Sequence, residues 1–187
     1  MTIVKVARLL FYIAISLVTA QPGYYEAQQK HIGVINEMRR EFAKKFQISN
    51  MHELVWDRDV EKRAQDDPVP TYNGIYDWRY HLLLYTLKNH GLYTSKSDMQ
   101  GYEYLIDEES ERDFRNKISD GEDKTLHTFE WFLPAQKKFG CSIRYGANLC
   151  VLMPELHFGS FFEARGTPGS KCDKGYSNND GLCSLPK

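Results

Sequence analysis

Four cysteines, all in the last third of the chain, constrain the fold more than any other feature of the sequence. They are Cys141, Cys150, Cys172 and Cys183 in a chain of 187 residues. Four cysteines allow three pairings. Pairing of sequence neighbours is the simplest, because one bridge would cross-link a hairpin that turns at residues 145–148 and the other would close a loop in a polar tail. A zinc site is the alternative, although the spacing differs from a pair of Cys-x-x-Cys units.

Residues 1–20 have the composition of a secretory signal. Lys5 and Arg8 supply the positive start, Leu9–Val18 is apolar, and Ala20 ends the segment with a small side chain. A membrane anchor is the alternative, but the apolar run has about ten residues, whereas a membrane span needs about 20. We therefore predict cleavage after Ala20 and a secreted, extracellular protein with no transmembrane segment in the mature chain. Because that compartment is oxidising, the four cysteines are expected to form two disulfides.

Removal of the signal leaves 167 residues, which is enough for one domain with a core of its own. The loss of Lys5 and Arg8 leaves 22 basic and 25 acidic side chains, so the mature chain carries a net charge of −3. Proteins that bind nucleic acid concentrate basic side chains on one face, so nucleic acid is not expected as a partner. We predict a signal peptide over residues 1–20, a domain over 21–165 and a disulfide-bonded tail over 166–187.

The N-terminal half of the mature chain predicts helices. Residues 25–47 place apolar side chains at every third or fourth position, which is the spacing of one buried helix face. Asn50 has the side chain of an N-cap, with a glutamate three residues later, and predicts a second helix that ends near Gln65. The aromatic-rich run 75–93 predicts a buried helix in its middle, and residues 100–118 predict a surface helix.

From Thr125 onward the pattern changes to short apolar runs between proline and glycine residues. The runs Thr128–Leu133, Cys141–Ile143 and Leu149–Met153 predict strands, or a short helix followed by strands. Helices first and antiparallel strands later are typical of a layered α+β domain. The predicted fold class is therefore α+β.

The stretch after residue 126 resembles the CAP superfamily of cysteine-rich secretory proteins, venom allergens and pathogenesis-related proteins. It shares with that family a histidine that opens an aromatic-rich segment, two basic residues, a Gly-Cys pair and a second local pair of cysteines. An Asn-x-x-Arg segment in the first helix is also similar to the family. The resemblance implies a three-layer α-β-α sandwich with a central antiparallel sheet and a short disulfide-bonded C-terminal tail. The residues that carry it are His127, Lys137, Lys138, Gly140, Cys141, Cys150, Cys172, Cys183, Asn36 and Arg39.

CAP domains line a central cleft with two histidines and two glutamates, which hold a divalent metal in some members. His127 matches the second family histidine, and Glu108 resembles the glutamate that precedes it. The motifs of the other two cleft residues are missing, and His81 or His90 stands in for the first histidine only by its distance from Gly91. The resemblance therefore gives His127, Glu108 and His81 as cleft candidates. Of these, His127 and Glu108 are the candidate metal ligands, because imidazole and carboxylate suit zinc.

The function implied by the resemblance is binding outside the cell. CAP domains engage sterols, fatty acids or other proteins, and a similar range of partners is expected for this chain without a cofactor or a catalytic residue. The alternative is a metal-dependent extracellular hydrolase that uses His127 and Glu108, with a divalent metal such as zinc as its cofactor. Nucleophilic catalysis is not expected, because no serine lies in a Gly-x-Ser-x-Gly setting and two disulfides leave no free thiol.

Overall fold

The computed structural model describes residues 23–66, 81–84, 92–93, 95–96, 112, 130–144, 147–154 and 164–186. The predicted α+β class is confirmed. The signal segment and most of residues 100–118 lie outside the described residues. In chain order the elements are α2 (Tyr24–Phe46), β1 (Val55–Trp56), α3 (Arg58–Asp66), β2 (His81–Leu84), the 3-10 helix η6 (Glu130–Phe132), β3 (Lys138–Arg144), β4 (Ala147–Met153), β5 (Ser177–Asn179) and β6 (Leu182–Ser184).

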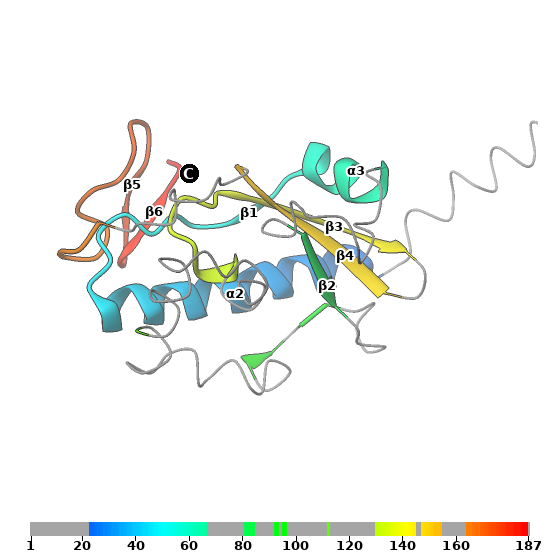
Figure 1. Ribbon diagram of the computed structural model, residues 1–187, viewed down its shortest axis with the longest axis horizontal. Helices are drawn as coiled ribbons and strands as arrows, with labels where there is room; N and C mark the ends of the chain where they lie inside the picture. Colours follow the sequence, from blue (N-terminus) through cyan, green and yellow to red (C-terminus); the bar gives the residue numbers. More distant parts are fainter. Residues whose placement is uncertain are drawn as a thin grey trace, which may run out of the picture.

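Four strands form the main sheet, in the order β1-β3-β4-β2 (Figure 1). β3 and β4 are antiparallel neighbours, as are β4 and β2, whereas β1 runs parallel to β3 and pairs Val55 with Lys138. The expectation of a purely antiparallel sheet is therefore wrong at the β1 edge. Parallel neighbours need a long crossover connection, and here the chain from α3 to residue 137 provides it.

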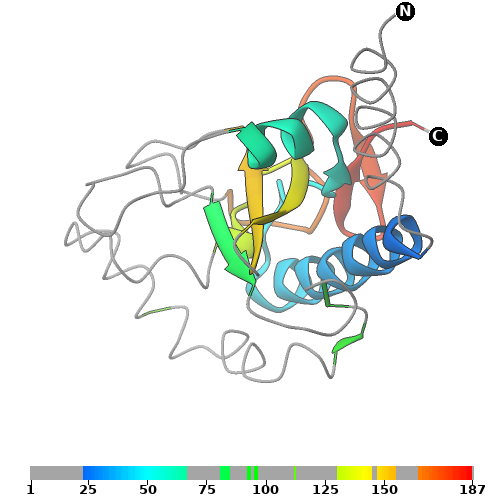
Figure 2. The same ribbon diagram turned by 90° about the vertical axis from the view of Figure 1, so that its right-hand side faces the viewer.

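The two long helices lie on opposite sides of the main sheet (Figure 2). On the α3 side, a Cβ added at Gly140 of β3 would lie 2.2 Å from the backbone nitrogen of Glu61. Only glycine allows the helix to approach the strand this closely. Because alternate strand residues face opposite ways, the neighbours of Gly140 in β3 face away from α3 and toward α2. The larger core lies on this side of the sheet. It includes Ile35, Met38, Phe42, Leu54, Trp131, Phe139 and Leu152.

The first predicted helix is confirmed as α2, but the second helix begins later than predicted. It starts at Arg58, where Asp57 Oδ1 accepts hydrogen bonds from the backbone N–H groups of Asp59 at 3.0 Å and Val60 at 3.1 Å. The true cap is thus Asp57 and not Asn50. The residues between them are extended because they pair with β3 and with β6, which are distant in sequence. The end of the helix, at Asp66, is one residue past the predicted one.

Residues 81–84 form the edge strand β2, so the prediction of a helix in the middle of 75–93 is wrong there. Their backbone pairs with residues 148–151 of β4. A short apolar run suits a buried helix or a buried strand equally, and only the tertiary pairing distinguishes the two. The predicted strands at 141–143 and 149–153 are confirmed as parts of β3 and β4, and η6 is the short helix of the alternative prediction.

Both predicted disulfides are present. Cys141 and Cys150 face each other across β3 and β4, with a Cα–Cα distance of 4.0 Å. Cys172 and Cys183 are joined with a Cα–Cα distance of 5.2 Å. No cysteine of the chain is free. The disulfide alternative is therefore confirmed over the four-cysteine zinc site.

Strand β6, within the segment predicted as a disulfide-bonded tail, reaches the core. Leu182 and Cys183 of β6 are fully buried. The backbone N–H of Cys183 donates to Met51 O at 2.7 Å, and Cys183 O accepts from the N–H of Glu53 at 2.9 Å. The strand β6 thus joins β5 on one side and residues 51–53 on the other. The polar sequence of this segment does not predict these contacts, because backbone groups make most of them.

The β5–β6 hairpin turns at Asp180 and Gly181, whose φ angles of 51° and 94° fit a two-residue turn of the type that Asp-Gly favours. The Asp180 carboxylate lies 2.7 Å from Lys44 Nζ and 3.4 Å from Arg40 Nε, so the hairpin tip rests on the C-terminal half of α2 (Figure 1). Among the described residues, no helix has the length and apolar character needed to cross a membrane.

Candidate functional site

The cleft residues expected from the sequence lie mostly outside the described part of the chain. Glu108, His127 and the stand-in His90 are outside it. His81 is the first residue of β2, and its backbone pairs with Val151 of β4 at the edge of the main sheet. The structure therefore places one of the candidates on the sheet and leaves their mutual distances untested.

The segment that follows His127 is held in place by Arg39 of α2. This side chain is fully buried and donates hydrogen bonds to the carbonyl oxygens of Trp131, of Leu133 at 3.0 Å and of Gln136 at 3.1 Å. Burial lowers the pKa of Arg39 to about 9, so the guanidinium stays charged at neutral pH. Residues 131–136 are thus fixed to α2 by one cation, immediately after the stretch that contains the expected cleft histidine.

Arg39 also ties this segment to the chain before β1. Its Nε donates to the carbonyl oxygen of His52 at 2.9 Å. One turn earlier on α2, the Asn36 side-chain amide donates to Leu54 O at 2.8 Å and accepts from the N–H of Leu54 at 2.8 Å. This amide thus pairs with the backbone N–H and C=O of Leu54, next to the β1 edge of the sheet. Without it, these two groups would be buried and unpaired. The Asn-x-x-Arg segment is therefore a structural clamp between α2 and two loops.

A buried histidine that the sequence did not single out lies in the N-terminal half of α2. His31 is fully buried, and its ring contacts the rings of Tyr93, Trp131 and Phe139 at centroid distances of 5.7, 5.5 and 5.3 Å. Its Nδ1 lies 3.0 Å from the backbone N and O of Tyr93, and its Nε2 has no hydrogen-bond partner among the described residues. Burial lowers the pKa of His31 to about 4, so the ring is neutral at pH 7. The sequence signal for the burial of His31 is its spacing of four residues from both Ala27 and Ile35, which places it on the apolar face of the helix.

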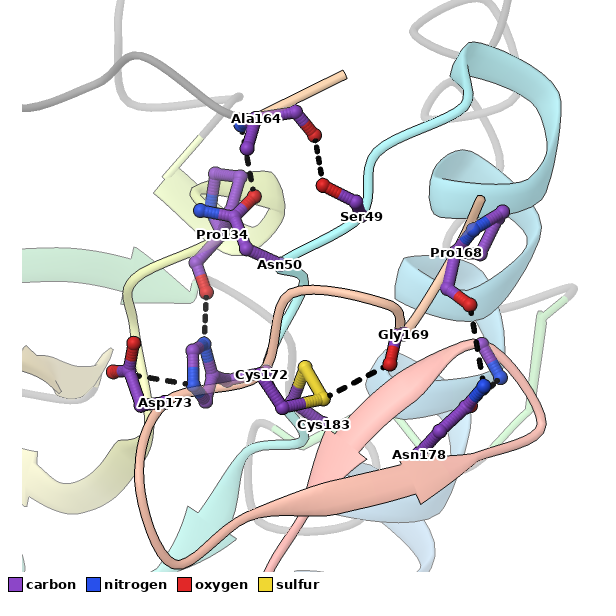
Figure 3. Close-up of a disulfide and its surroundings, with 12 residues drawn as sticks. Ser49, Asn50, Pro134, Ala164, Pro168, Gly169, Cys172, Asp173, Asn178 and Cys183 are labelled. Atoms are coloured by element: carbon purple, nitrogen blue, oxygen red, sulfur yellow. Dashed lines mark hydrogen bonds and ion pairs between the residues drawn. A yellow bond between two sulfur atoms is a disulfide. The ribbon is translucent and has the colours of Figure 1, made fainter. Parts of the chain in front are cut away.

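A second missed histidine, His52, lies at the junction between the N-terminal and C-terminal parts of the domain. Its side chain is 2% exposed, with Nδ1 3.0 Å from Pro134 O and Nε2 3.3 Å from Asp173 Oδ2. The Pro134 carbonyl and the Asp173 carboxylate, both labelled in Figure 3, thus lie beside different nitrogens of the ring. Asp173 also pairs with Lys137, and Tyr176 packs edge-on against the imidazole at 4.8 Å.

Several charges set the protonation of this junction. Burial lowers the pKa of His52 and is the largest effect, and the positive charges of Lys137 and Arg39 act in the same direction. The Pro134 carbonyl and the Asp173 carboxylate oppose them. The hydrogen bond from Lys137 lowers the pKa of Asp173, which is therefore ionised at neutral pH. The neutral His52 can donate from only one ring nitrogen, although an acceptor oxygen lies near each.

A partly buried carboxylate, Glu61 of α3, is fully engaged by neighbouring donors. It accepts from Gln28 Nε2 at 3.2 Å, from Trp56 Nε1 at 3.1 Å and from Arg58 Nη1 at 2.5 Å. These donors come from α2, β1 and α3, so the carboxylate joins both helices around the β1 edge of the sheet. Burial, followed by the charge of Glu61, raises the pKa of Tyr24 to about 12. The hydrogen bonds of this carboxylate thus stabilise the packing of both helices against β1.

The described part of the chain holds no group of three or more His, Cys, Asp or Glu side chains that could bind a metal ion. Its two buried histidines each have one ring nitrogen beside a backbone carbonyl, and its cysteines are oxidised.

Comparison with known proteins bears on the fold. No family model matches the sequence, and no curated protein matches it. The structure is similar to the hookworm platelet inhibitor, with a TM-score of 0.56 and 17% identity over 86% of this chain and 91% of that one. It is equally similar to NaASP2 solved with Zn2+, with a TM-score of 0.56 and 18% identity over 85% of this chain and 95% of the other. Both are secreted hookworm proteins with the CAP fold.

The chain has the CAP fold. The resemblance noted in the sequence is therefore confirmed at the level of fold, across most of the length of both structural neighbours. In this CAP fold the Asn-x-x-Arg clamp fixes the segment next to the expected cleft, and the second cysteine pair anchors the C-terminal hairpin.

Proposed function

We propose that the chain is a secreted, non-catalytic CAP-like protein that acts by binding a sterol, a fatty acid or a protein outside the cell. The shared fold with the hookworm platelet inhibitor carries the proposal, because inhibition of a cell is an activity that a binding protein can perform. Cleavage after Ala20 and the three-layer α-β-α arrangement are part of the proposal. The chain has two disulfides, which suit an oxidising compartment. Three of their cysteines, Cys141, Cys150 and Cys183, are fully buried.

Equilibrium binding tests the proposal. The protein would be expressed through a secretory pathway, and the mass of the product would show whether residues 1–20 are removed. Saturable binding of a labelled sterol, a labelled fatty acid or an extracellular protein is expected, and the reduced and alkylated protein serves as the unfolded control. Absence of binding to all three classes, with the disulfides intact, would contradict the proposal.

The zinc in the NaASP2 structure supports the alternative of a metal-dependent hydrolase. His127 and Glu108 would hold the ion, and zinc bound there would supply an activated water molecule. Zinc content of the purified secreted protein distinguishes the two functions. The binding proposal expects His127→Ala, Glu108→Gln and the wild type to contain the same low amount of zinc. Stoichiometric zinc that is lost in both variants and kept in the control His52→Asn would establish the metal site.

A further inference from the structure

The turn formed by residues 173–176 covers His52. The N–H of Tyr176 donates to Asp173 O at 3.0 Å, and Gly175 has a φ of 90°, which closes the turn. The turn contributes the Asp173 carboxylate and the Tyr176 ring to the junction with His52. Lys137 holds the cover down, because its ammonium pairs with Asp173 and lies 5.1 Å from the centre of the Tyr176 ring. The ring of His52 is thus shut off from solvent by a turn that itself lies at the surface.

Protonation of His52 in the closed form is opposed by its surroundings. The charged groups that face it are Asp173 of the turn, Lys137 next to β3 and Arg39 of α2. Lys137 already neutralises the only carboxylate among them, so a new imidazolium would add a third positive charge to a buried junction. The imidazolium would gain little from Asp173, because Nε2 lies 3.3 Å from Asp173 Oδ2 but is not aligned for a hydrogen bond. When the turn lifts, water can solvate the imidazolium instead.

One ring nitrogen of His52, and polar side chains adjacent in sequence to the residues that contact it, are unpaired in the closed form. Within the described residues, both side-chain amide atoms of Gln136 and the hydroxyl of Ser184 are buried without a hydrogen-bond partner, as is His52 Nε2. Gln136 adjoins Lys137 in sequence, and Ser184 adjoins Cys183, which pairs with His52. A buried polar group without a partner costs about 1–3 kcal/mol. Opening of the turn exposes His52 Nε2 to water, which offsets part of the free energy needed to separate the turn from His52 and Lys137.

We propose that the turn of residues 173–176 is a proton-sensitive cover, which opens when His52 takes up a proton. Since the pKa of His52 lies below its ordinary value in the closed form, the open form binds the proton more tightly. The open form therefore gains population as the pH falls below about 6.5, and the gain stops at the pKa of the closed form. Leu182 and Cys183 remain buried in this step, and the disulfide Cys172–Cys183 limits how far the turn can move.

Hydrogen–deuterium exchange at single amides tests this cover. The reporter is the amide of Tyr176, whose hydrogen bond closes the turn, and the reference amides lie in the centre of β3 and β4. Between pH 7.5 and pH 5.0 the opening equilibrium of the turn should rise several-fold, with an upper limit of about thirty-fold set by the ordinary pKa of histidine. Each exchange rate is divided by the intrinsic rate at the same pH. The reference amides should change less than the turn.

His52→Asn is the decisive variant, because its amide can donate to Pro134 O from the position of Nδ1 and has no proton to gain. The pH-dependent opening should disappear in it. Lys137→Gln should reduce the pH dependence as well, because one of the two opposing cations is removed. A wild type without pH dependence at Tyr176, a dependence equal to that of β3 and β4, or one that persists in His52→Asn would overturn the proposal. If His52→Asn does not fold, Lys137→Gln and the wild-type comparison decide.

Discussion

Acidification from pH 7 to pH 4 should lower the free energy of unfolding by about 3 kcal/mol through His31 alone. Burial gives this side chain a pKa of about 4 in the folded state, against an ordinary value of 6.5. Between these two pH values the unfolded chain binds more protons than the folded chain, so stability rises with pH. The contribution is complete above pH 6.5 and is lost as the pH falls toward 4. The interval between the two pKa values, at about 1.36 kcal/mol for each pH unit, gives the estimate of about 3 kcal/mol.

The assay is urea unfolding of the oxidised protein at a series of pH values, followed by tryptophan fluorescence. The test variant is His31→Asn, which retains an amide near the position of Nδ1 for the backbone of Tyr93 but cannot gain a proton. This variant should be less stable than the wild type at pH 7, because it leaves space among the aromatic rings. It should also lose less stability on acidification.

The informative quantity is the difference between the two pH dependences, since every other titrating group contributes equally to both proteins. The pKa of His52 is also lowered from its ordinary value of 6.5, so His52 also reduces the stability of the fold as the pH falls below that value. Some pH dependence of the stability will therefore remain in His31→Asn. The variant His52→Asn is the matched control and should retain the larger, His31-dependent part. If wild type and His31→Asn lose the same stability between pH 7 and pH 4, the burial argument for this histidine is wrong.

Three further substitutions and one control substitution test the fold. Gly140→Ala should destabilise by about 3 kcal/mol in urea unfolding, because its Cβ would meet the backbone of α3, whereas the exposed helical Gly33→Ala, with open space around it, should stabilise by about 0.5–1 kcal/mol. Asn36→Ala should cost about 2–4 kcal/mol, since the buried N–H and C=O of Leu54 lose their partners; thermal unfolding with a change below 1 kcal/mol would contradict this. Arg39→Lys should cost about 3 kcal/mol, because an ammonium cannot reach four carbonyl oxygens at once; a neutral result in the same assay would argue against the clamp.

Local patterns predicted the elements whose contacts are local. The spacing of apolar residues gave α2, and the short apolar runs around the first two cysteines gave β3 and β4, because each run carries its own periodicity or turn. Residues 51–56 were mistaken for the start of a helix, since Asn50 and the following glutamate imitate a capping pattern. Their extended form depends on Cys183 and Lys138, which lie far away in the sequence. No local signal reports such a pairing.

The site was harder to predict than the fold. The sequence pointed to His127 and Glu108 through a family motif, and they lie outside the described residues. His31 and His52 were not predicted as site residues. Their burial arises from Tyr93, Trp131 and the turn at 173–176, which converge only in three dimensions. The pKa of each histidine depends on these neighbours, and the composition of the sequence does not predict which residues they are.

The pairing of Cys183 with residues 51–53 has a consequence for how the protein is made. The segment from Met51 to Glu53 is synthesised about 130 residues before its partner strand β6. Until β6 has been synthesised, the backbone at 51–53 lacks this partner, and the apolar face that Leu182 covers stays exposed to water. The core at this junction can therefore close only after β6 has been made.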